Sequence, residues 1–300
     1  MPAAVYGNPP ADVLETPKGA RQLSPLIPGS DDVAQVADAS FDQVALLVPP
    51  GAVEARYAIA QGLRTLAPGG ALIAAAPKDR GGLRLKRTLE AFGCDVAETA
   101  RRHHRICAVE RPATLTGLDE AITEGAPRLL PSGLWSQPGV FSWDRLDPGS
   151  DLLLKHLPKL KGRGADFGCG IGWLSRAVLS SPDVTSLLLI DLDRRAIDCA
   201  RRNVEDPRAT IEWADVRRTA TPLADLDFVV MNPPFHDGGA EDRALGQAFI
   251  RAASAALRKG GSLWLTANRH LPYEAVLGEA FKAVKPVADS GGFKVYEARR

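Results

Sequence analysis

The stretch that decides the fold is GADFGCGIG, residues 164–172, which is followed directly by the helical pattern WLSRAV of residues 173–178. A short apolar run leads into a loop with glycine at every second position, namely Gly168, Gly170 and Gly172. Such glycines let the backbone turn sharply and leave no Cβ in the way of a ligand that lies across the strand ends. We therefore expect a strand, a ligand-binding loop and a helix, as in an open α/β sheet.

The spacing of these glycines distinguishes two kinds of nucleotide site. A dinucleotide-binding fingerprint has the form GxGxxG, but Trp173 occupies the position of its third glycine. The residues instead have the pattern DxGxGxG, with Asp166 ahead of Gly168. A nicotinamide cofactor is therefore disfavoured.

Acidic residues follow the next two expected strands. Asp191 ends the apolar run LLLID, where the ribose hydroxyls of a bound nucleoside would lie, and a carboxylate accepts two such hydrogen bonds well. Asp193 lies two residues further along and could cap the next helix instead. Asp215 comes after the strand pattern TIEW of residues 210–213. For Asp166 and Asp215 taken separately, a capping or turn role is the alternative.

The run DFVVMNPPF, residues 227–235, predicts an apolar strand that ends in Asn-Pro-Pro-Phe at the carboxyl edge of the sheet. The side-chain oxygen of Asn232 and the carbonyl of Pro233 can accept the two N–H bonds of an exocyclic amine, and the paired prolines hold that carbonyl in place. Phe235 can stack on a base, a contact worth about 1 to 3 kcal/mol. A simple Pro-Pro turn is the alternative, but the glycine loop and the acids that precede this run argue against it.

The four cysteines, Cys94, Cys107, Cys169 and Cys199, show neither CxxC spacing nor a His-Cys cluster. This argues against a disulfide scaffold and against a bound metal. Cys169 lies between two glycines, but its motif holds no base that would activate a nucleophile. We expect reduced, mostly buried thiols.

The first half of the chain, from about Gln43 to Arg111, repeats the α/β pattern of the second. LAPGGALI, residues 66–73, aligns with LRKGGSLW, residues 257–264, each as a helix end, a glycine turn and a strand. Carried forward, this register also places Arg105 near Lys294.

Carried backward, the register places Val48 where the second half has Asn232. The first half also lacks a glycine-rich turn like that of residues 168–172. We therefore interpret it as a degenerate copy of the same fold. The alternative is two unrelated α/β domains that match by chance.

Composition supports two domains, because 300 residues with 45% hydrophobic content are enough for two cores. The segment from Glu124 to Pro148 is dense in Pro, Gly and Trp, and it predicts an ordered linker whose tryptophans pack. We expect a first domain at residues 1–125 and a second, catalytic domain at residues 139–300.

The formal net charge of +1 excludes a polycation that coats nucleic acid indiscriminately. Two local basic patches remain, RGGLRLKR at residues 80–87 and RRHHR at residues 101–105, and either could equally be ordinary solvated surface. Residues 1–28 lack the apolar run of a signal peptide, and no segment is long enough to span a bilayer. We expect a soluble, cytoplasmic protein without a membrane partner.

The DxGxGxG segment resembles motif I of the class I methyltransferases. The second half of the chain resembles the ribosomal RNA small-subunit methyltransferase C family over nearly all of residues 139–300. The matching segments are GVFS (139–142), LDPGSDLLL (146–154), NPPFHDG (232–238), ANRHLPY (267–273) and GFKVY (292–296).

This resemblance implies an enzyme of two tandem Rossmann-like class I methyltransferase domains, the N-terminal one degenerate, that makes N2-methylguanine in ribosomal RNA. It implies S-adenosylmethionine as the cofactor and ribosomal RNA or a ribosomal subunit as the partner. The first domain would support the fold and help to bind RNA. Asp215 is placed like the family acid that recognises the adenine amino group, while Asn232, Pro233 and Phe235 would grip guanine. The cofactor-binding set would be Asp166, Gly168, Gly170, Gly172, Asp191 and Asp215.

Alternatives remain open, because the Asn-Pro-Pro-Phe tetrapeptide also fits adenine N6, cytosine N4 or a protein glutamine amide. Methylation of adenine in DNA normally needs a region that reads base edges, and no such insert is evident. A non-catalytic assembly factor that holds ribosomal RNA predicts loss of Asn232 or of the glycines, and both are present.

Overall fold

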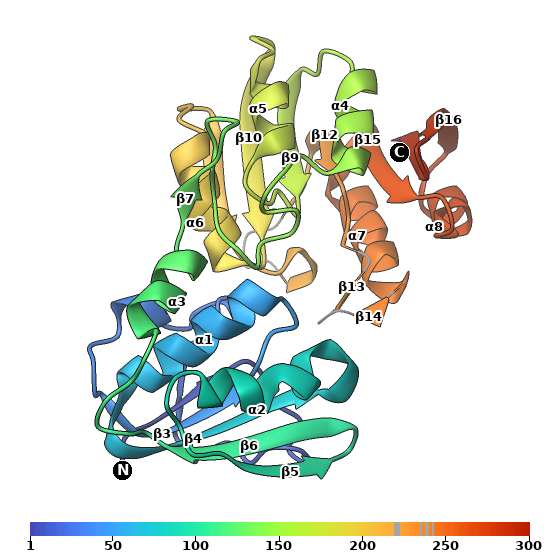
Figure 1. Cartoon of the computed structure of the whole chain (residues 1–300). Helices are drawn as coiled ribbons and strands as arrows, with labels where there is room; N and C mark the ends of the chain where they lie inside the picture. The colour runs from blue at the N-terminus through green and yellow to red at the C-terminus, as the bar shows by residue number, and fades with distance from the viewer. Residues whose placement is uncertain (219–222, 235, 238–239, 242) are drawn as a thin grey trace. The chain divides into compact units, whose positions relative to one another are not determined.

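The computed structural model describes residues 1–218, 223–234, 236–237, 240–241 and 243–300 (Figure 1). The chain divides into two compact units, Met1–Ala126 and Pro127–Arg300. Each unit has its own sheet and its own hydrophobic core. Among the described residues, no helix combines the length and the apolar composition that a bilayer crossing requires.

The second unit contains a seven-stranded sheet with the order β11-β10-β9-β12-β15-β17-β16. The first five strands in this order pair in parallel. Strand β17 pairs antiparallel with both of its neighbours, β15 and β16. In chain order the elements are β7 (Arg128–Leu129), β8 (Trp135–Ser136), α4 (Pro148–His156), β9 (Gly162–Phe167), α5 (Trp173–Leu179), β10 (Val184–Asp191), α6 (Arg194–Asn203), β11 (Ala209–Trp213), η3 (Val216–Arg218), β12 (Leu226–Met231), β13 (His236–Asp237), β14 (Ala240–Glu241), α7 (Arg243–Ala256), β15 (Leu257–Asn268), α8 (Tyr273–Ala280), β16 (Ala283–Ser290) and β17 (Phe293–Arg299).

Helices cover both faces of this sheet, and strand β12 shows why its sequence is apolar throughout. Phe228 and Val230 pack in the cluster that contains residues of α4, α5 and α6, whereas Val229 and Met231 pack in the cluster that contains residues of α7 and α8. Successive side chains of a strand point to opposite faces. A strand buried on both faces therefore needs an unbroken apolar run.

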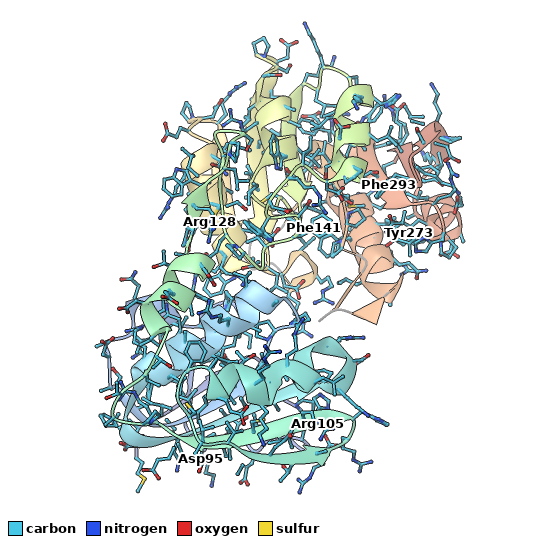
Figure 2. All side chains as sticks on the ribbon, in the orientation of Figure 1. Asp95, Arg105, Arg128, Phe141, Tyr273 and Phe293 are labelled. Atoms are coloured by element: carbon cyan, nitrogen blue, oxygen red, sulfur yellow. The ribbon has the colours of Figure 1, made fainter. Side chains whose placement is uncertain are left out.

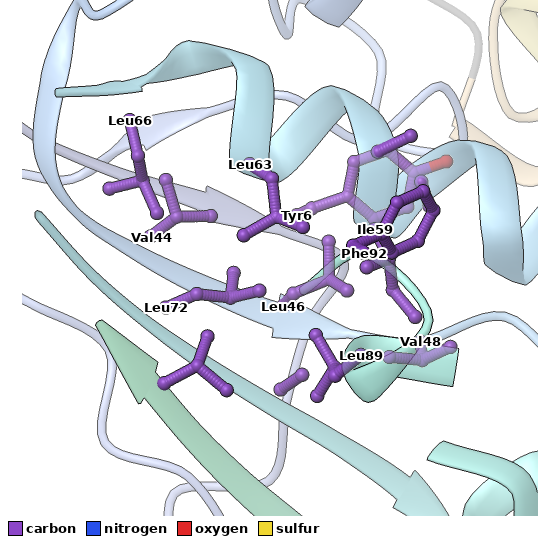
Figure 3. Packing of buried hydrophobic residues seen from close by; sticks show 14 of the residues in the cluster. Tyr6, Val44, Leu46, Val48, Ile59, Leu63, Leu66, Leu72, Leu89 and Phe92 are labelled. Carbon is purple, nitrogen blue, oxygen red and sulfur yellow. The ribbon is translucent and has the colours of Figure 1, made fainter. Parts of the chain in front are cut away.

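The first unit contains a six-stranded sheet with the order β2-β1-β3-β4-β6-β5. All three of its α-helices contribute to one apolar cluster on a single face of the sheet, which includes Leu46, Ile59 and Leu89 (Figure 3). In chain order the elements are β1 (Ala3–Tyr6), β2 (Arg21–Gln22), η1 (Val33–Gln35), β3 (Phe41–Leu47), α1 (Ala52–Thr65), β4 (Leu66–Pro77), η2 (Lys78–Gly82), α2 (Leu83–Glu90), β5 (Ala97–Arg101), β6 (His104–Glu110) and α3 (Leu118–Gly125).

The six strands of the first sheet match six of the seven strands of the second in the same order, which confirms the predicted repeat. The order β2-β1-β3-β4-β6-β5 of the first unit corresponds to β10-β9-β12-β15-β17-β16 of the second. Both glycine turns use a left-handed glycine, with φ of 79° at Gly69 and 81° at Gly260. Arg105 pairs with Ala76 in the first unit as Lys294 pairs with Ala267 in the second, as the sequence register predicts.

The predicted equivalence of Val48 with Asn232 is wrong by one residue. Gln43 of β3 pairs with Ala71, and Phe228 of β12 pairs with Ser262, a position equivalent to Ala71 in the glycine register. Counting forward from these pairs places Leu47 at the position of Asn232. The Pro-Pro dipeptides of the two halves are therefore offset by one, which misled the sequence alignment.

The repeat begins before Gln43, where the sequence pattern places its start, because β1 pairs with β3 as β9 pairs with β12. This register places Val5 where the second unit has Asp166, and Gly7, with φ of 88°, where it has Gly168. Val5 packs in a small apolar cluster with Val13, Leu14, Ala45 and Ala75. The degenerate unit thus keeps one glycine of the loop but buries hydrocarbon where the second unit has a carboxylate.

We predict that Gly164→Ala destabilises the second unit, because a Cβ at Gly164 would lie 2.0 Å from Cε2 of the buried Phe228 ring. Overpacking of this kind costs about 1 to 3 kcal/mol or more. All five tryptophans lie between residues 135 and 264, so urea unfolding followed by tryptophan fluorescence reports on this unit. Gly278→Ala is the matched control, since its Cβ would meet nothing within 4 Å in helix α8. Equal unfolding midpoints for both variants would contradict the packing described here.

Candidate active site

Four neighbouring parallel strands, β11, β10, β9 and β12, end at one edge of the second sheet. Asp191 ends β10, whereas Asp215, Gly168 and Asn232 follow β11, β9 and β12 within two residues. Since the carboxyl ends of parallel strands meet at the same edge, the fold brings the predicted site residues of the described chain together there.

The glycine loop has the conformation that its sequence predicts. Gly168, Gly170 and Gly172 have φ angles of 71°, 54° and 96°. The N–H groups of Gly168 and Cys169 donate to the carbonyl oxygen of Ile190 at 2.9 and 3.0 Å, which fixes the loop to β10. A Cβ at Gly170 would meet nothing within 4 Å. The loop is therefore anchored at its start and leaves open space above Gly170.

Asp191 joins this loop to the end of β10. Its Oδ2 accepts from the Gly170 N–H at 2.8 Å, and its Oδ1 accepts from the Asp193 N–H at 2.9 Å. The side chain stays partly exposed. Burial raises its pKa to about 6, against the backbone hydrogen bonds that lower it. Each carboxylate oxygen has further lone pairs, so Asp191 is held in place with acceptor capacity remaining.

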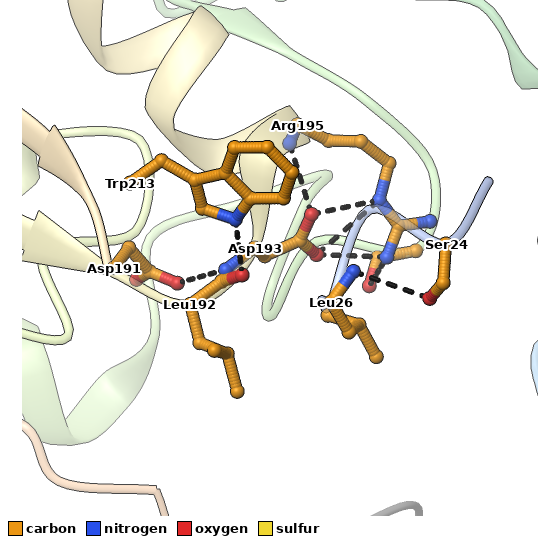
Figure 4. A network of polar contacts seen from close by, with 8 residues as sticks. Ser24, Leu26, Asp191, Leu192, Asp193, Arg195 and Trp213 are labelled. Carbon is orange, nitrogen blue, oxygen red and sulfur yellow. Dashed lines mark hydrogen bonds and ion pairs between the residues drawn. The ribbon is translucent and has the colours of Figure 1, made fainter. Parts of the chain in front are cut away.

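Asp193 caps helix α6, which confirms the capping alternative considered for it. Its Oδ1 accepts a hydrogen bond from the Arg195 backbone N–H at 2.9 Å, and its carboxylate also accepts hydrogen bonds from Nε and Nη2 of the Arg195 side chain (Figure 4). Beside this pair, Nε1 of Trp213 donates to the carbonyl oxygen of Leu192 at 2.7 Å. These bonds fix the turn that follows Asp191.

Asp166 is completely buried in β9. Its Oδ2 accepts from the Ser175 hydroxyl at 2.6 Å, while its Oδ1 has no hydrogen-bond partner. Burial raises its pKa to about 7, and the nearby Asp191 carboxylate adds to the rise. An unpaired acceptor in a cluster of carboxylates favours a cationic donor.

Asp215 forms a turn with its own neighbour. Its carboxylate accepts from Nε of Arg217 at 2.9 Å, from Nη2 at 2.7 Å and from the Arg217 backbone N–H at 2.9 Å. The hydrogen bond from the Arg217 side chain holds the pKa of this carboxyl below its usual range. The turn role considered for Asp215 is thus present in the structure, and its contact with adenine stays a prediction.

Two residues that no sequence motif singled out hold the side chain of Asn232. Its Nδ2 donates to Oδ2 of Asp147 at 2.8 Å and to Oγ of Ser150 at 3.0 Å. Among the residues that the structure describes, no donor reaches its Oδ1. Pro233 is buried, and the following Pro234 lies against Gly168, its Cδ 4.0 Å from where a Cβ at that glycine would be. The Asn-Pro-Pro segment therefore lies beside the glycine loop.

Asp147 and Ser150 belong to the start of helix α4. Asp147 is the N-cap residue, its Oδ2 accepts from the Ser150 N–H at 2.8 Å, and Pro148 occupies the first turn. Asp-Pro-x-Ser is a recognisable helix-start pattern. The sequence could reveal the cap, but only the tertiary fold brings it to Asn232, 85 residues further along the chain.

Other predicted features have mixed outcomes. The proposed stacking residue Phe235 lies outside the described residues, and the side chains of His236 and Asp237 are not described either. All four cysteines are free and buried, as expected, and burial raises the pKa of Cys169 well above its usual value. Among the described residues, no group of His, Cys, Asp and Glu side chains could hold a metal ion.

The predicted packing of the linker tryptophans is confirmed. Trp135, Trp143 and Trp173 pack against an apolar cluster that includes Ile171 of the glycine loop. The buried side chain of Asn203 accepts from the Trp135 N–H at 2.7 Å, and its Nδ2 donates to the carbonyl oxygens of Trp135 and Ile171, both at 2.9 Å. Asn203, which the sequence did not single out, therefore ties the linker to the glycine loop.

We predict that the stability of the second unit falls as the pH rises from about 4 to 7. The pKa of Asp166 rises from 3.8 to about 7 on folding, so the folded state binds more protons than the unfolded state across this range. Asp166→Asn should flatten the fall, measured as urea midpoints by tryptophan fluorescence. An unchanged pH slope in the variant would show that Asp166 does not titrate in this window.

Comparison with known proteins identifies the family. The Methyltransferase small domain model matches residues 132–297. The ribosomal RNA small subunit methyltransferase C of Shewanella loihica is 32% identical over 271 residues, which cover 87% of this chain and 78% of that protein. That of Shewanella baltica is 36% identical over 158 residues, which cover 53% of this chain and 46% of that protein.

A solved structure shows the same fold along the whole chain. It is a 16S ribosomal RNA N2-guanine methyltransferase from T. thermophilus, in complex with AdoMet and guanosine. It has a TM-score of 0.78 and 24% sequence identity, and the match covers 100% of this chain and 88% of that chain. The predicted fold class, two tandem class I methyltransferase domains of which the first is degenerate, is confirmed.

The family match agrees with the glycine loop and with the Asn-Pro-Pro segment beside it, and it confirms the prediction of a methyltransferase that uses S-adenosylmethionine. This chain belongs to the ribosomal RNA small subunit methyltransferase C family.

Proposed function

We propose that this protein methylates the exocyclic N2 amine of a guanine in small-subunit ribosomal RNA. The observation that carries the proposal is the fixed orientation of Asn232, whose amide nitrogen is engaged by Asp147 and Ser150. That orientation leaves its oxygen as an acceptor beside the glycine loop. An acceptor is what an amine substrate needs.

The residues around the glycine loop fit the cofactor. S-adenosylmethionine supplies an electrophilic methyl group on a positively charged sulfur. Asp191, fixed by Gly170, would accept hydrogen bonds from the ribose hydroxyls, and the open space at Gly170 leaves room for the nucleoside. The unpaired Oδ1 of Asp166 would receive the ammonium group of the amino-acid portion. Asp215 would meet the adenine amino group with a carboxylate that Arg217 already orients.

Asn232 and Pro233 would position the reacting nitrogen. The two N–H bonds of the amine would be accepted by Asn232 Oδ1 and the Pro233 carbonyl, which aims the nitrogen lone pair at the methyl group. The nitrogen lone pair would form a bond to the methyl group that the cofactor supplies, while the bonding electrons would leave on sulfur and the positive charge would pass to the nitrogen. The methylated nitrogen then loses a proton to solvent, so no strong general base is needed. Phe235 would stack on the base.

Guanine N2 and the small ribosomal subunit are proposed from the relatives. The curated relatives are small-subunit ribosomal RNA enzymes, and the solved T. thermophilus relative is an N2-guanine methyltransferase with guanosine bound. We also propose the cytoplasm as the location of this activity, in keeping with a ribosomal RNA substrate. We keep the domain limits proposed from the sequence, residues 1–125 for a supporting domain and residues 139–300 for the catalytic domain.

The first unit would support the fold and contribute contacts to RNA phosphates. Its two basic patches include four exposed arginines: Arg84 and Arg87 on helix α2, and Arg101 and Arg102 where β5 ends and turns into β6. Arg102 pairs with Asp12 at 3.3 Å, so part of this charge is neutralised within the unit. Phosphate contacts from these arginines would make RNA binding weaken with salt.

The test is methyl transfer from labelled S-adenosylmethionine to unmodified small and large ribosomal subunits, their free RNAs and DNA, followed by nucleoside analysis. We expect N2-methylguanosine from small-subunit RNA. Label only in N6-methyladenine of DNA, or label that resists ribonuclease but yields to protease, would overturn the substrate. The absence of label from every acceptor, with cofactor binding intact, would favour a non-catalytic RNA-binding role.

In the same assay, we predict that Asn232→Ala lowers turnover by about 10²- to 10³-fold, the scale of a lost preorganised polar group. Its affinity for S-adenosylmethionine should stay within about threefold of the wild type, because the side chain of Asn232, among the described residues, hydrogen-bonds to Asp147 and Ser150 and to none of the proposed cofactor residues. An active variant would refute the role of this amide.

We predict that Asp191→Ala weakens S-adenosylmethionine binding by about 10- to 100-fold, because two charge-assisted hydrogen bonds to the ribose are lost. Isothermal titration calorimetry measures the affinity without RNA. Asp198→Ala is the control, since Asp198 lies on helix α6, which follows β10, and among the described residues its carboxylate pairs with Arg201 at the surface. Unchanged affinity in Asp191→Ala would show that another acid holds the ribose.

A further inference from the structure

At the N-terminus of helix α4, one carboxylate oxygen accepts two hydrogen bonds, one from the helix itself and one from Asn232. Oδ2 of Asp147 accepts from the Ser150 N–H and from Nδ2 of Asn232, both at 2.8 Å. The first bond caps the helix, and the second connects the cap to the Asn-Pro-Pro segment.

These contacts permit one orientation of the Asn232 amide. The NH₂ group has two hydrogens, and Asp147 Oδ2 and Ser150 Oγ can accept one each. If the amide were turned by 180°, its oxygen would face the carboxylate oxygen of Asp147, and two acceptors would then oppose each other. The cap therefore fixes which amide atom points away from α4.

The charge of Asp147 also acts on the amide electronically. A hydrogen bond from an amide N–H to a carboxylate is charge-assisted and about twice as strong as a neutral one. Such a bond shifts electron density toward the amide oxygen, because bonds in a chain polarise one another. Positive charge develops on the substrate nitrogen during transfer, so a more negative Oδ1 stabilises the transition state more than the ground state.

The packing around the cap keeps Asp147 in position. A Cβ at Gly149 would lie 2.7 Å from Cδ1 of Phe293, labelled in Figure 2, and 3.0 Å from Oδ2 of Asp147. Ser150 is buried as well. In the first unit Leu47 replaces Asn232, and no helix of that unit packs on the face that corresponds to α4. The amide and its cap are thus absent together from the degenerate copy.

We propose that Asp147 is a positioning residue for methyl transfer, which, together with Ser150, fixes and polarises the Asn232 amide so that Oδ1 accepts from the substrate amine. This inference rests on the proposed function for the identity of the substrate. The hydrogen bond between Asp147 and Asn232 does not depend on that function. It assigns Asp147 a role in turnover rather than in cofactor or RNA binding.

Kinetics separate this role from a purely structural one. Asp147→Ser keeps a capping oxygen but loses the reach and the charge, and Asp147→Asn keeps the shape and loses the charge only. We expect kcat to fall about 10- to 100-fold in Asp147→Ser and by less in Asp147→Asn, with KM for RNA and cofactor affinity within about threefold. Asp32→Asn, at the cap of η1 in the first unit, is the matched control and should leave kcat unchanged.

A double-mutant cycle tests whether Asp147 acts through Asn232. In the Asn232→Ala background, Asp147→Ser should cost less than about threefold more, because the amide on which it acts is gone. A full, multiplicative loss in that background would overturn the proposal, as would a single Asp147→Ser variant with wild-type kcat.

A measurement without substrate keeps this proposal separate from the proposed function. The chain has four asparagines, Asn8, Asn203, Asn232 and Asn268, so selective ¹⁵N-asparagine labelling gives four side-chain NH₂ signals. The signal that disappears in Asn232→Ala should exchange slowly with water, and should shift and exchange faster in Asp147→Ser. If wild-type protein methylates no RNA but this coupling is present, the proposed function fails while the contact stands. A signal that is insensitive to Asp147→Ser overturns the inference whatever the substrate.

Discussion

The hydrogen bonds between the Asn232 amide and the cap of helix α4 are the constraint on which the site depends. A side-chain amide has a donor end and an acceptor end of nearly equal shape, so a strand end alone does not decide which end faces a substrate. Asp147 and Ser150 decide it by accepting both N–H bonds. The prolines that follow restrict the backbone in the same segment, and Pro234 packs near Gly168. The residues proposed to hold the substrate and those proposed to hold the cofactor therefore lie at the same edge of the second sheet.

The carboxylates near the ends of the neighbouring strands β9 and β10 cost stability, and the ligand-binding role proposed for them would explain that cost. Asp166 has an unpaired oxygen and a pKa raised to about 7, and burial raises the pKa of Asp191 to about 6. Stability alone would favour hydrocarbon at such a place, and the first unit has Val5 there. The two halves of the chain therefore show the same fold with and without this electrostatic strain.

Much of the fold could be predicted from the sequence, because it depends on local signals. The DxGxGxG loop, the apolar run before Asn232 and the paired glycine turns each reflect backbone geometry that neighbouring residues determine. The predicted equivalence of Val48 with Asn232 was wrong because the sequence alignment matched the two Pro-Pro dipeptides to each other. The strand registers of β3 with β4 and of β12 with β15 show that these dipeptides are offset by one residue. Strand β1 was overlooked because four residues carry too little pattern to identify a strand. Asp147 was visible as part of a helix start, but its partner lies 85 residues away, and only packing reveals that contact.

The most direct test is a crystal structure of the protein with S-adenosylhomocysteine and guanosine. The geometry predicts guanosine N2 within about 2.8 to 3.2 Å of both Asn232 Oδ1 and the Pro233 carbonyl, with Nδ2 of Asn232 still bound to Asp147. A guanosine that binds elsewhere, or an Asn232 amide that turns its nitrogen toward the base, would contradict the site described here.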